Sequence, residues 1–257
     1  MREITIGSLF AGIGGLELGL ERAIPGARTI WQVEQDPFAR RVLAKHWPEA
    51  DRSITDVREV TRETVQRPDI LVGGFPCPGF SSAGREKGFE NERSGLWREF
   101  VRIISDVRPR KYLILENVAA IVRGQWLGAI LADLVATGWM GGCIWDCIPA
   151  ASVGAPFSGE GRDRFFLVAF SNGIGCLREG ISREPQGQLV GSLARGDSPF
   201  TGLSGPAPDH WEDPPGIRRV ADGIPDRAHR IRCLGNAVVP QVAEVIGRVV
   251  CELERTR

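Results

Sequence analysis

The chain has 257 residues, and its 32 lysine and arginine residues are balanced by 32 aspartate and glutamate residues. A chain of this length buries one sizeable core, with room for a small appended domain. The zero net charge excludes an overall basic surface, so any contact with a nucleic acid has to come from a local patch.

Strand and helix patterns alternate along the first 170 residues. An apolar strand is predicted over residues 3–9, and the glycines after it open a helix over residues 16–23. The later strands are predicted over 29–33, 70–73, 112–115 and 164–170, and the later helices over 37–46, 96–107 and 126–137. This alternation predicts an α/β fold with a mostly parallel sheet that carries helices on both faces.

The composition changes after the last of these strands. Residues 171–226 are rich in Gly, Pro, Ser and scattered charge, which indicates either a small recognition domain or an insertion without regular structure. An apolar helix over 239–254 is expected to pack back on the large domain. We therefore divide the chain into a catalytic and cofactor-binding domain at 1–170, a small recognition region at 171–226 and a returning C-terminal segment at 227–257.

The cysteine pattern and the lack of long apolar runs narrow the class of protein. The six cysteines show no C-x-x-C spacing and no histidines at zinc-finger distances, so we expect no metal site and no disulfide framework. No signal peptide precedes the first predicted strand, and no long uncharged apolar run occurs. We therefore expect a cytoplasmic protein without membrane contact, in a compartment where thiols stay reduced.

One cysteine stands out, because Cys77 lies between two prolines in the stretch GGFPCPGFS at residues 73–81. Proline fixes φ and glycine removes side-chain bulk, so this loop can hold a thiol rigidly while a flat substrate approaches. Glu116 follows the next apolar strand. A thiol and a carboxylic acid at the ends of two strands are what addition to a heteroaromatic ring requires. A buried structural cysteine is the common alternative, but it does not explain the prolines.

A glycine turn, FAGIGG at residues 10–15, joins the first strand to the first helix, where backbone N–H groups can meet a ligand. Alone this signal is weak, since a plain tight turn or a dinucleotide site fits it too. Phe10 offers a flat face for an adenine, Glu34 suits a ribose, and Asp56 can accept a hydrogen bond from an exocyclic amine.

Taken together, the motifs resemble those of the cytosine-C5 DNA methyltransferases. The resemblance runs over residues 4–170 and 227–250, and in chain order it comprises FAGIGG, Glu34, TDV at 55–57, GGFPCPGFS, RSGLW at 93–97, ENV at 116–118, RDRFF at 162–166 and LGNAVVPQVA at 234–243. It implies a Rossmann-like class I methyltransferase fold, with the region 171–226 as a small irregular target-recognition domain. It also implies a bacterial or phage enzyme, nucleoid-associated, that methylates double-stranded DNA with S-adenosylmethionine, alone or beside a cognate restriction endonuclease.

The resemblance also assigns roles to residues of this chain. Cys77 would attack C6 of a flipped cytosine while Glu116 holds or protonates N3, after which C5 takes the methyl group, loses its proton and releases Cys77 as 5-methylcytosine forms. Arg164 would contact O2 of the base, and Arg162 and Asn117 would brace the pocket. The residues implied for the cofactor are Phe10, Gly12, Gly14, Glu34, Asp56, Val57, Leu96, Asn236 and Val238.

Two departures from the family's pattern stand beside this resemblance. Pro78 follows Cys77 where glutamine is usual, and residues 157–161 separate Pro156 from Arg162 where a shorter link containing glutamine is usual. Three other functions remain open at this point: an RNA cytosine-C5 methyltransferase, a catalytically impaired DNA-binding relative, and a nucleotide-dependent oxidoreductase that only the glycine turn favours.

Overall fold

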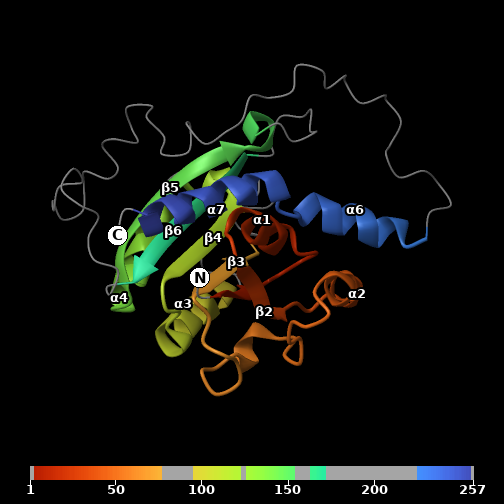
Figure 1. The fold of residues 1–257 in the computed structure, drawn as a ribbon, viewed down its shortest axis with the longest axis horizontal. Coiled ribbons are helices and arrows are strands. Elements are labelled where there is room, and N and C mark those ends of the chain that lie inside the picture. The colour runs from red at the N-terminus through yellow and green to blue at the C-terminus, as the bar shows by residue number, and fades with distance from the viewer. Residues whose placement is uncertain (1–2, 77–94, 123–125, 154–162, 172–224, 256–257) are drawn as a thin grey trace.

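The computed structural model describes residues 3–76, 95–122, 126–153, 163–171 and 225–255. In this part of the chain, six strands form one sheet in the order β2-β1-β3-β4-β6-β5 (Figure 1). The strands are β1 (Ile4–Leu9), β2 (Ala27–Val33), β3 (Ile70–Gly74), β4 (Tyr112–Val118), β5 (Met140–Pro149) and β6 (Asp163–Ser171). Strands β2, β1, β3 and β4 are parallel, whereas β6 runs antiparallel to both β4 and β5. The predicted α/β fold with a mostly parallel sheet is confirmed.

The helices cover both faces of this sheet, as expected (Figure 1). They are α1 (Gly15–Ala23), α2 (Pro37–His46), α3 (Gly95–Val107), α4 (Trp126–Ala136), α6 (Arg227–Asn236) and α7 (Pro240–Arg255), with short 3₁₀ turns at Val57–Glu59, Ala119–Val122 and Ala150–Val153. Two elements were not predicted. Strand β5 carries two glycines and buries only Ile144 and Ile148, and α6 buries none of its residues, so neither shows a clear apolar period.

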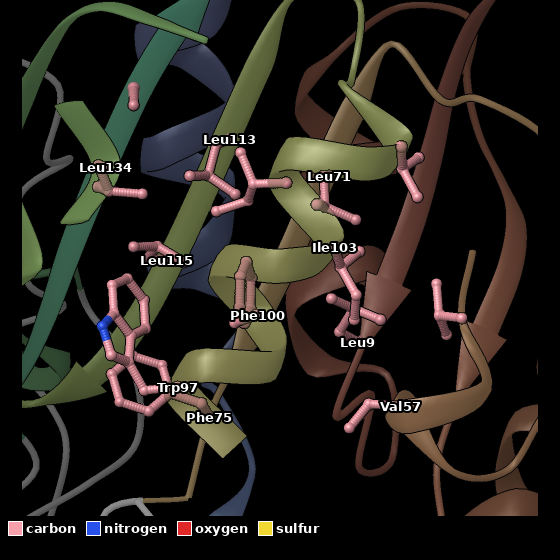
Figure 2. Packing of buried hydrophobic residues seen from close by; sticks show 14 of the residues in the cluster. Leu9, Val57, Leu71, Phe75, Trp97, Phe100, Ile103, Leu113, Leu115 and Leu134 are labelled. Atoms are coloured by element: carbon pink, nitrogen blue, oxygen red, sulfur yellow. The ribbon is translucent and has the colours of Figure 1, made fainter. Parts of the chain in front are cut away.

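Alternation along the strands divides the core into two clusters. Ile6, Val72 and Ile114 face α1 and α7, whereas their neighbours face α3 and α4. On the second face, Leu71, Leu113 and Leu115 meet the α3 side chains Trp97, Phe100 and Ile103 (Figure 2). The Trp97 indole also donates a 2.7 Å hydrogen bond to Asp133 of α4, which ties the two helices on this face together.

Helix α7 belongs to the core. Residues 227–255 are long and apolar enough to cross a membrane by length and composition alone. The apolar side of α7 is nevertheless buried against α1 and the sheet, through residues that include Val242, Val245, Ile246 and Val250. Such burial is the usual state of a core helix in a globular domain.

Close contact between α1 and α7 depends on glycine. A Cβ at Gly19 would stand 2.3 Å from the Pro240 carbonyl oxygen and 2.4 Å from the Ala243 Cβ. We therefore expect Gly19→Ala to lower the free energy of unfolding by about 1–3 kcal/mol, because the helices must separate. At Gly128 of α4 no described atom lies within 4 Å of that position. Gly128→Ala is the matched control, and there we expect a gain of about 0.5–1 kcal/mol. Urea unfolding of both variants measures the difference, and equal effects would contradict this packing.

Candidate active site

A cavity of about 490 Å³ opens at the carboxyl ends of the parallel strands, which is where open α/β sheets bind ligands. Every strand from β1 to β4 contributes to its wall, through its last residues or the turn that follows. Residues from β6, α3 and α6 complete it. The wall includes Phe10, Gly12, Glu34, Val57, Gly74, Phe75, Pro76, Leu96, Glu116, Asn117, Arg164, Arg232, Cys233 and Asn236.

The central ionisable pair of this cavity is Glu116 with Arg164. Glu116 lies inside β4, not after it as the sequence indicated, because the strand continues to Val118. Arg164 stands opposite Val118 on antiparallel β6, so it is the diagonal neighbour of Glu116. The Arg164 Nε lies 3.0 Å from the Glu116 Oε1, and the two side chains form an ion pair.

Burial decides the protonation of Glu116, whose exposed fraction is 8%. It raises the pKa of this carboxyl to about 7, although the positive charge of Arg164 acts in the opposite direction. A carboxyl that titrates near neutral pH can both give and accept a proton under physiological conditions. Glu116 is therefore equipped for general acid–base catalysis.

Asn117 fixes the start of the loop that leads to Cys77. Its Nδ2 donates to the Phe75 carbonyl oxygen at 3.2 Å, and its Oδ1 accepts from the Val118 backbone N–H at 2.8 Å. The side chain is buried, so both hydrogen bonds are shielded from water. Cys77 and Arg162, the other predicted catalytic residues, lie outside the described residues.

Gly74 leaves the space that the Glu116 carboxyl occupies. The two residues are register partners on β3 and β4, and a Cβ at Gly74 would stand 2.5 Å from the Glu116 Oε2. Because a side-chain end can move aside, Gly74→Ala should fold but displace the carboxyl. We expect its catalytic rate to fall by about 100-fold, with Gly128→Ala as the control. A single-turnover assay measures this, and an unchanged rate would show that the position of Glu116 is not critical.

The residues on the other side of the cavity fit a nucleoside. At Gly12, where φ is +57°, no described atom lies within 4 Å of the place of a Cβ, so the turn leaves open space for a ligand. Its N–H donates to the Glu34 Oε2 at 2.8 Å, and the Asp36 N–H donates to the Oε1 at 2.8 Å. These two bonds fix the Glu34 carboxylate and leave lone pairs for ribose hydroxyls. Phe10, stacked on Phe100 at 6.2 Å, adds an aromatic face.

Some of the residues predicted for the cofactor are not in this wall. A Cβ at Gly14 would stand 2.3 Å from the Trp47 ring, so Gly14 packs against that indole and not against the cavity. Asp56 accepts from the Arg58 N–H at 3.0 Å and pairs with its guanidinium, while its neighbour Val57 lines the cavity. Val238 lines a second, smaller cavity of about 50 Å³.

Sequence reasoning missed Asp36 and Arg232. Asp36 caps α2 by accepting hydrogen bonds from the N–H groups of Ala39 and Phe38, and these bonds hold the pKa of Asp36 below its usual range. Asp36 also forms an ion pair with Arg232 of α6. The His229 ring stacks on Phe38 at 5.9 Å beside this pair. An aspartate followed by proline is an N-cap signature. No local signal could reveal the pairing with Arg232, which lies 196 residues away.

A mostly parallel sheet, a glycine turn after β1 and an acidic residue after β2 are features of the class I methyltransferase fold. The Entamoeba histolytica methyltransferase EhMeth has the same fold, with a TM-score of 0.65, 14% identity, and 98% of this chain and 99% of that one covered. Residues 4–189 match the family model of the C-5 cytosine-specific DNA methylases, and the chain belongs to this family.

Curated relatives agree with the family. The chain is 36% identical to the type II methyltransferase M.NlaX of Neisseria lactamica over 171 residues, which are 64% of this chain and 51% of that relative. It is 42% identical to the type II methyltransferase M.Eco47II of Escherichia coli over 122 residues, covering 46% of this chain and 28% of that relative. The matches thus span about half or less of the length of these relatives.

Proposed function

We propose that this chain transfers a methyl group from S-adenosylmethionine to C5 of a cytosine in double-stranded DNA. The observation that carries the proposal is the buried Glu116 carboxyl, which is paired with Arg164 and lies beside Gly74, where the loop that leads to Cys77 begins. Membership of the C-5 cytosine-specific DNA methylase family and the similarity to type II methyltransferases support it.

The proposed reaction begins with the thiolate of Cys77, which bonds to C6 of a flipped cytosine. The π electrons of the C5–C6 bond shift towards C4, those of the C4–N3 bond shift to N3, and N3 takes the proton that Glu116 holds. Arg164, which is already fixed by Glu116, donates to O2 of the base and stabilises the charge on the ring. Extruding the base costs a few kcal/mol of stacking and pairing, which contacts to the flipped base offset.

The second half of the reaction restores the protein groups. S-adenosylmethionine, when bound, supplies an electrophilic methyl group for the C5 carbon. After C5 has gained the methyl group it gives its proton to water, the electron pair of that C–H bond re-forms the C5–C6 double bond and expels the Cys77 thiolate, and Glu116 recovers its proton from N3. Each residue of the chain therefore returns to its starting state, as turnover requires.

The cofactor would lie between the glycine turn and α6. We assign the adenine to the aromatic face of Phe10 with Val57 and Leu96, and the ribose hydroxyls to Glu34. Asn236, at the end of α6, lines both cavities and would contact the part of the cofactor that lies between them. The open space at Gly12 supports this arrangement.

The relatives also bear on the cellular role. Both are named as type II methyltransferases and come from bacteria. We therefore propose that the protein acts on chromosomal DNA in a bacterial cytoplasm, with a cognate restriction endonuclease as its partner. The target sequence would be read by residues outside the described part of the chain.

Expression in a methylation-deficient host, followed by mapping of 5-methylcytosine across the DNA, tests the proposal. We expect a mark in one sequence context with the wild-type protein and none with Cys77→Ala. A mark on RNA alone would assign the chain to RNA instead. A folded wild-type protein that marks neither nucleic acid would contradict the proposed reaction.

A further inference from the structure

Glu17 is a buried acid that the proposed reaction does not use. It lies in the first turn of α1, and its side chain is fully buried. Its Oε1 accepts a long hydrogen bond of 3.4 Å from the Gln32 amide, whose own oxygen is held by Arg52 at 3.2 Å. Its Oε2 has no hydrogen-bond partner among the described residues. Leaving such an atom unpaired costs about 1–3 kcal/mol, a cost that a hydrogen-bond donor from a ligand would remove.

The charges around Glu17 do not compensate for its burial. Burial raises the pKa of Glu17 to about 7, and the like charge of Glu21 one turn later acts in the same direction, although the Ser8 hydroxyl beside it favours the ionised form. Among the described residues no ion pair reaches its carboxylate, because Arg52 contacts Gln32 instead. A cationic hydrogen-bond donor from a ligand would satisfy the Oε2 and stabilise the ionised form.

The small cavity of about 50 Å³ connects this acid to the site. Glu17 and Ser8 line it together with Gly15 and Val238. The large cavity shares another part of this wall, which includes Phe10, Gly12, Gly74, Glu116 and Asn236. The small cavity is therefore the deep continuation of the large one, on the side of the glycine turn. Its volume exceeds the roughly 10–15 Å³ that a cavity needs to hold one water, so a single small polar group fits.

We propose that Glu17 binds the α-ammonium group of the cofactor's aminoacyl end, which enters the small cavity from the large one. This inference rests on the proposed function, because its ligand is S-adenosylmethionine or the product S-adenosylhomocysteine. The ammonium donates to the Oε2 of Glu17, and the carboxyl gives up its proton to solvent as the cation arrives. Glu17 thereby selects cofactors that carry a free amine.

Calorimetric titration with two ligands tests this without turnover. S-adenosylhomocysteine carries the ammonium, whereas 5′-methylthioadenosine has the same adenine, ribose and thioether without the aminoacyl end. We expect Glu17→Gln to weaken the affinity for S-adenosylhomocysteine by about 10- to 100-fold, the usual effect of losing a charged hydrogen bond. The affinity for methylthioadenosine should stay within twofold of the wild-type value. The matched control is Glu21→Gln, one turn away, whose carboxylate accepts from Thr29 and Trp47; losing its charge favours the ionised form of Glu17, so this variant should weaken the binding of neither ligand.

Each outcome separates this inference from the proposed function. If the wild-type protein binds neither ligand, the cofactor assignment itself fails. If it binds S-adenosylhomocysteine and Glu17→Gln binds it equally well, only the role of Glu17 is overturned. Equal weakening of both ligands would also overturn it, because that pattern indicates a general change in the site.

A second measurement uses the wild-type protein alone and does not depend on the variant folding. At pH 6 Glu17 is mostly protonated, so binding of the ammonium group should release close to one proton from the Glu17 carboxyl. Titrations in buffers of different ionisation enthalpy count that proton. We expect release with S-adenosylhomocysteine and not with methylthioadenosine, and the same difference in Glu116→Gln, which removes the other titrating acid of the cavity. Equal release with both ligands would contradict the proposal.

Discussion

Glu116→Gln is expected to lower the rate of methyl transfer by about 10²- to 10⁴-fold, the usual contribution of a general acid–base residue. Glutamine keeps the size of the side chain and can still form a hydrogen bond, but it cannot give N3 a proton. Single-turnover transfer of a labelled methyl group to DNA measures the effect. Binding of S-adenosylhomocysteine should stay within twofold, which shows that the cavity is intact. A variant with the wild-type rate would remove Glu116 from the mechanism.

The pH profile gives the same residue a second signature. The pKa of Glu116 is raised from its ordinary 4.5 to about 7, so the folded protein holds the required proton below that pH and loses it above. The wild-type single-turnover rate should therefore decline as the pH rises through about 7. The residual rate of Glu116→Gln should not decline with pH in this way. A decline that persists in the variant would assign the titration to another group.

Cys77→Ala is expected to reduce methyl transfer to the background rate, because the bond to C6 is what makes C5 reactive. DNA with 5-fluorocytosine at the target provides a direct readout. Fluorine cannot leave C5 as a cation, so elimination stops and the protein stays bonded to the DNA. Denaturing electrophoresis should show this adduct for the wild type and not for Cys77→Ala.

A matched cysteine makes this test specific. Cys147 is a free, partly buried thiol on β5, and burial raises its pKa to about 11. Such a thiol is a poor nucleophile at neutral pH, so Cys147→Ala should still form the adduct. An adduct that survives in Cys77→Ala would place the nucleophile at another residue.

The order of strands and helices could be predicted because buried parallel strands are apolar and the helices have one apolar face. The same reasoning failed for α6, whose exposed residues carry no such period, and for the glycine-containing β5. The juxtaposition of Glu116 and Arg164 followed from motifs at the ends of β4 and β6, but it needed the resemblance to a family. Composition and periodicity alone would not have paired them.

Long-range pairing was the part of the site that sequence could not provide. The ion pair between Asp36 and Arg232 joins elements 196 residues apart, and the unpaired Oε2 of Glu17 is a property of the packed core. The cofactor roles of Gly14 and Asp56 stay predictions. In the structure Gly14 packs on Trp47 and Asp56 pairs with Arg58.

The contact between the first glycine turn and the segment before α7 has a practical consequence. A Cβ at Gly15 would stand 2.1 Å from the Val238 carbonyl oxygen, so the two ends of the chain meet directly at the cofactor cavity. Both segments must therefore be present before this cavity takes its shape. A gene divided between β6 and α6 would encode two polypeptides that each lack the complete cavity. Activity would then depend on the association of the two.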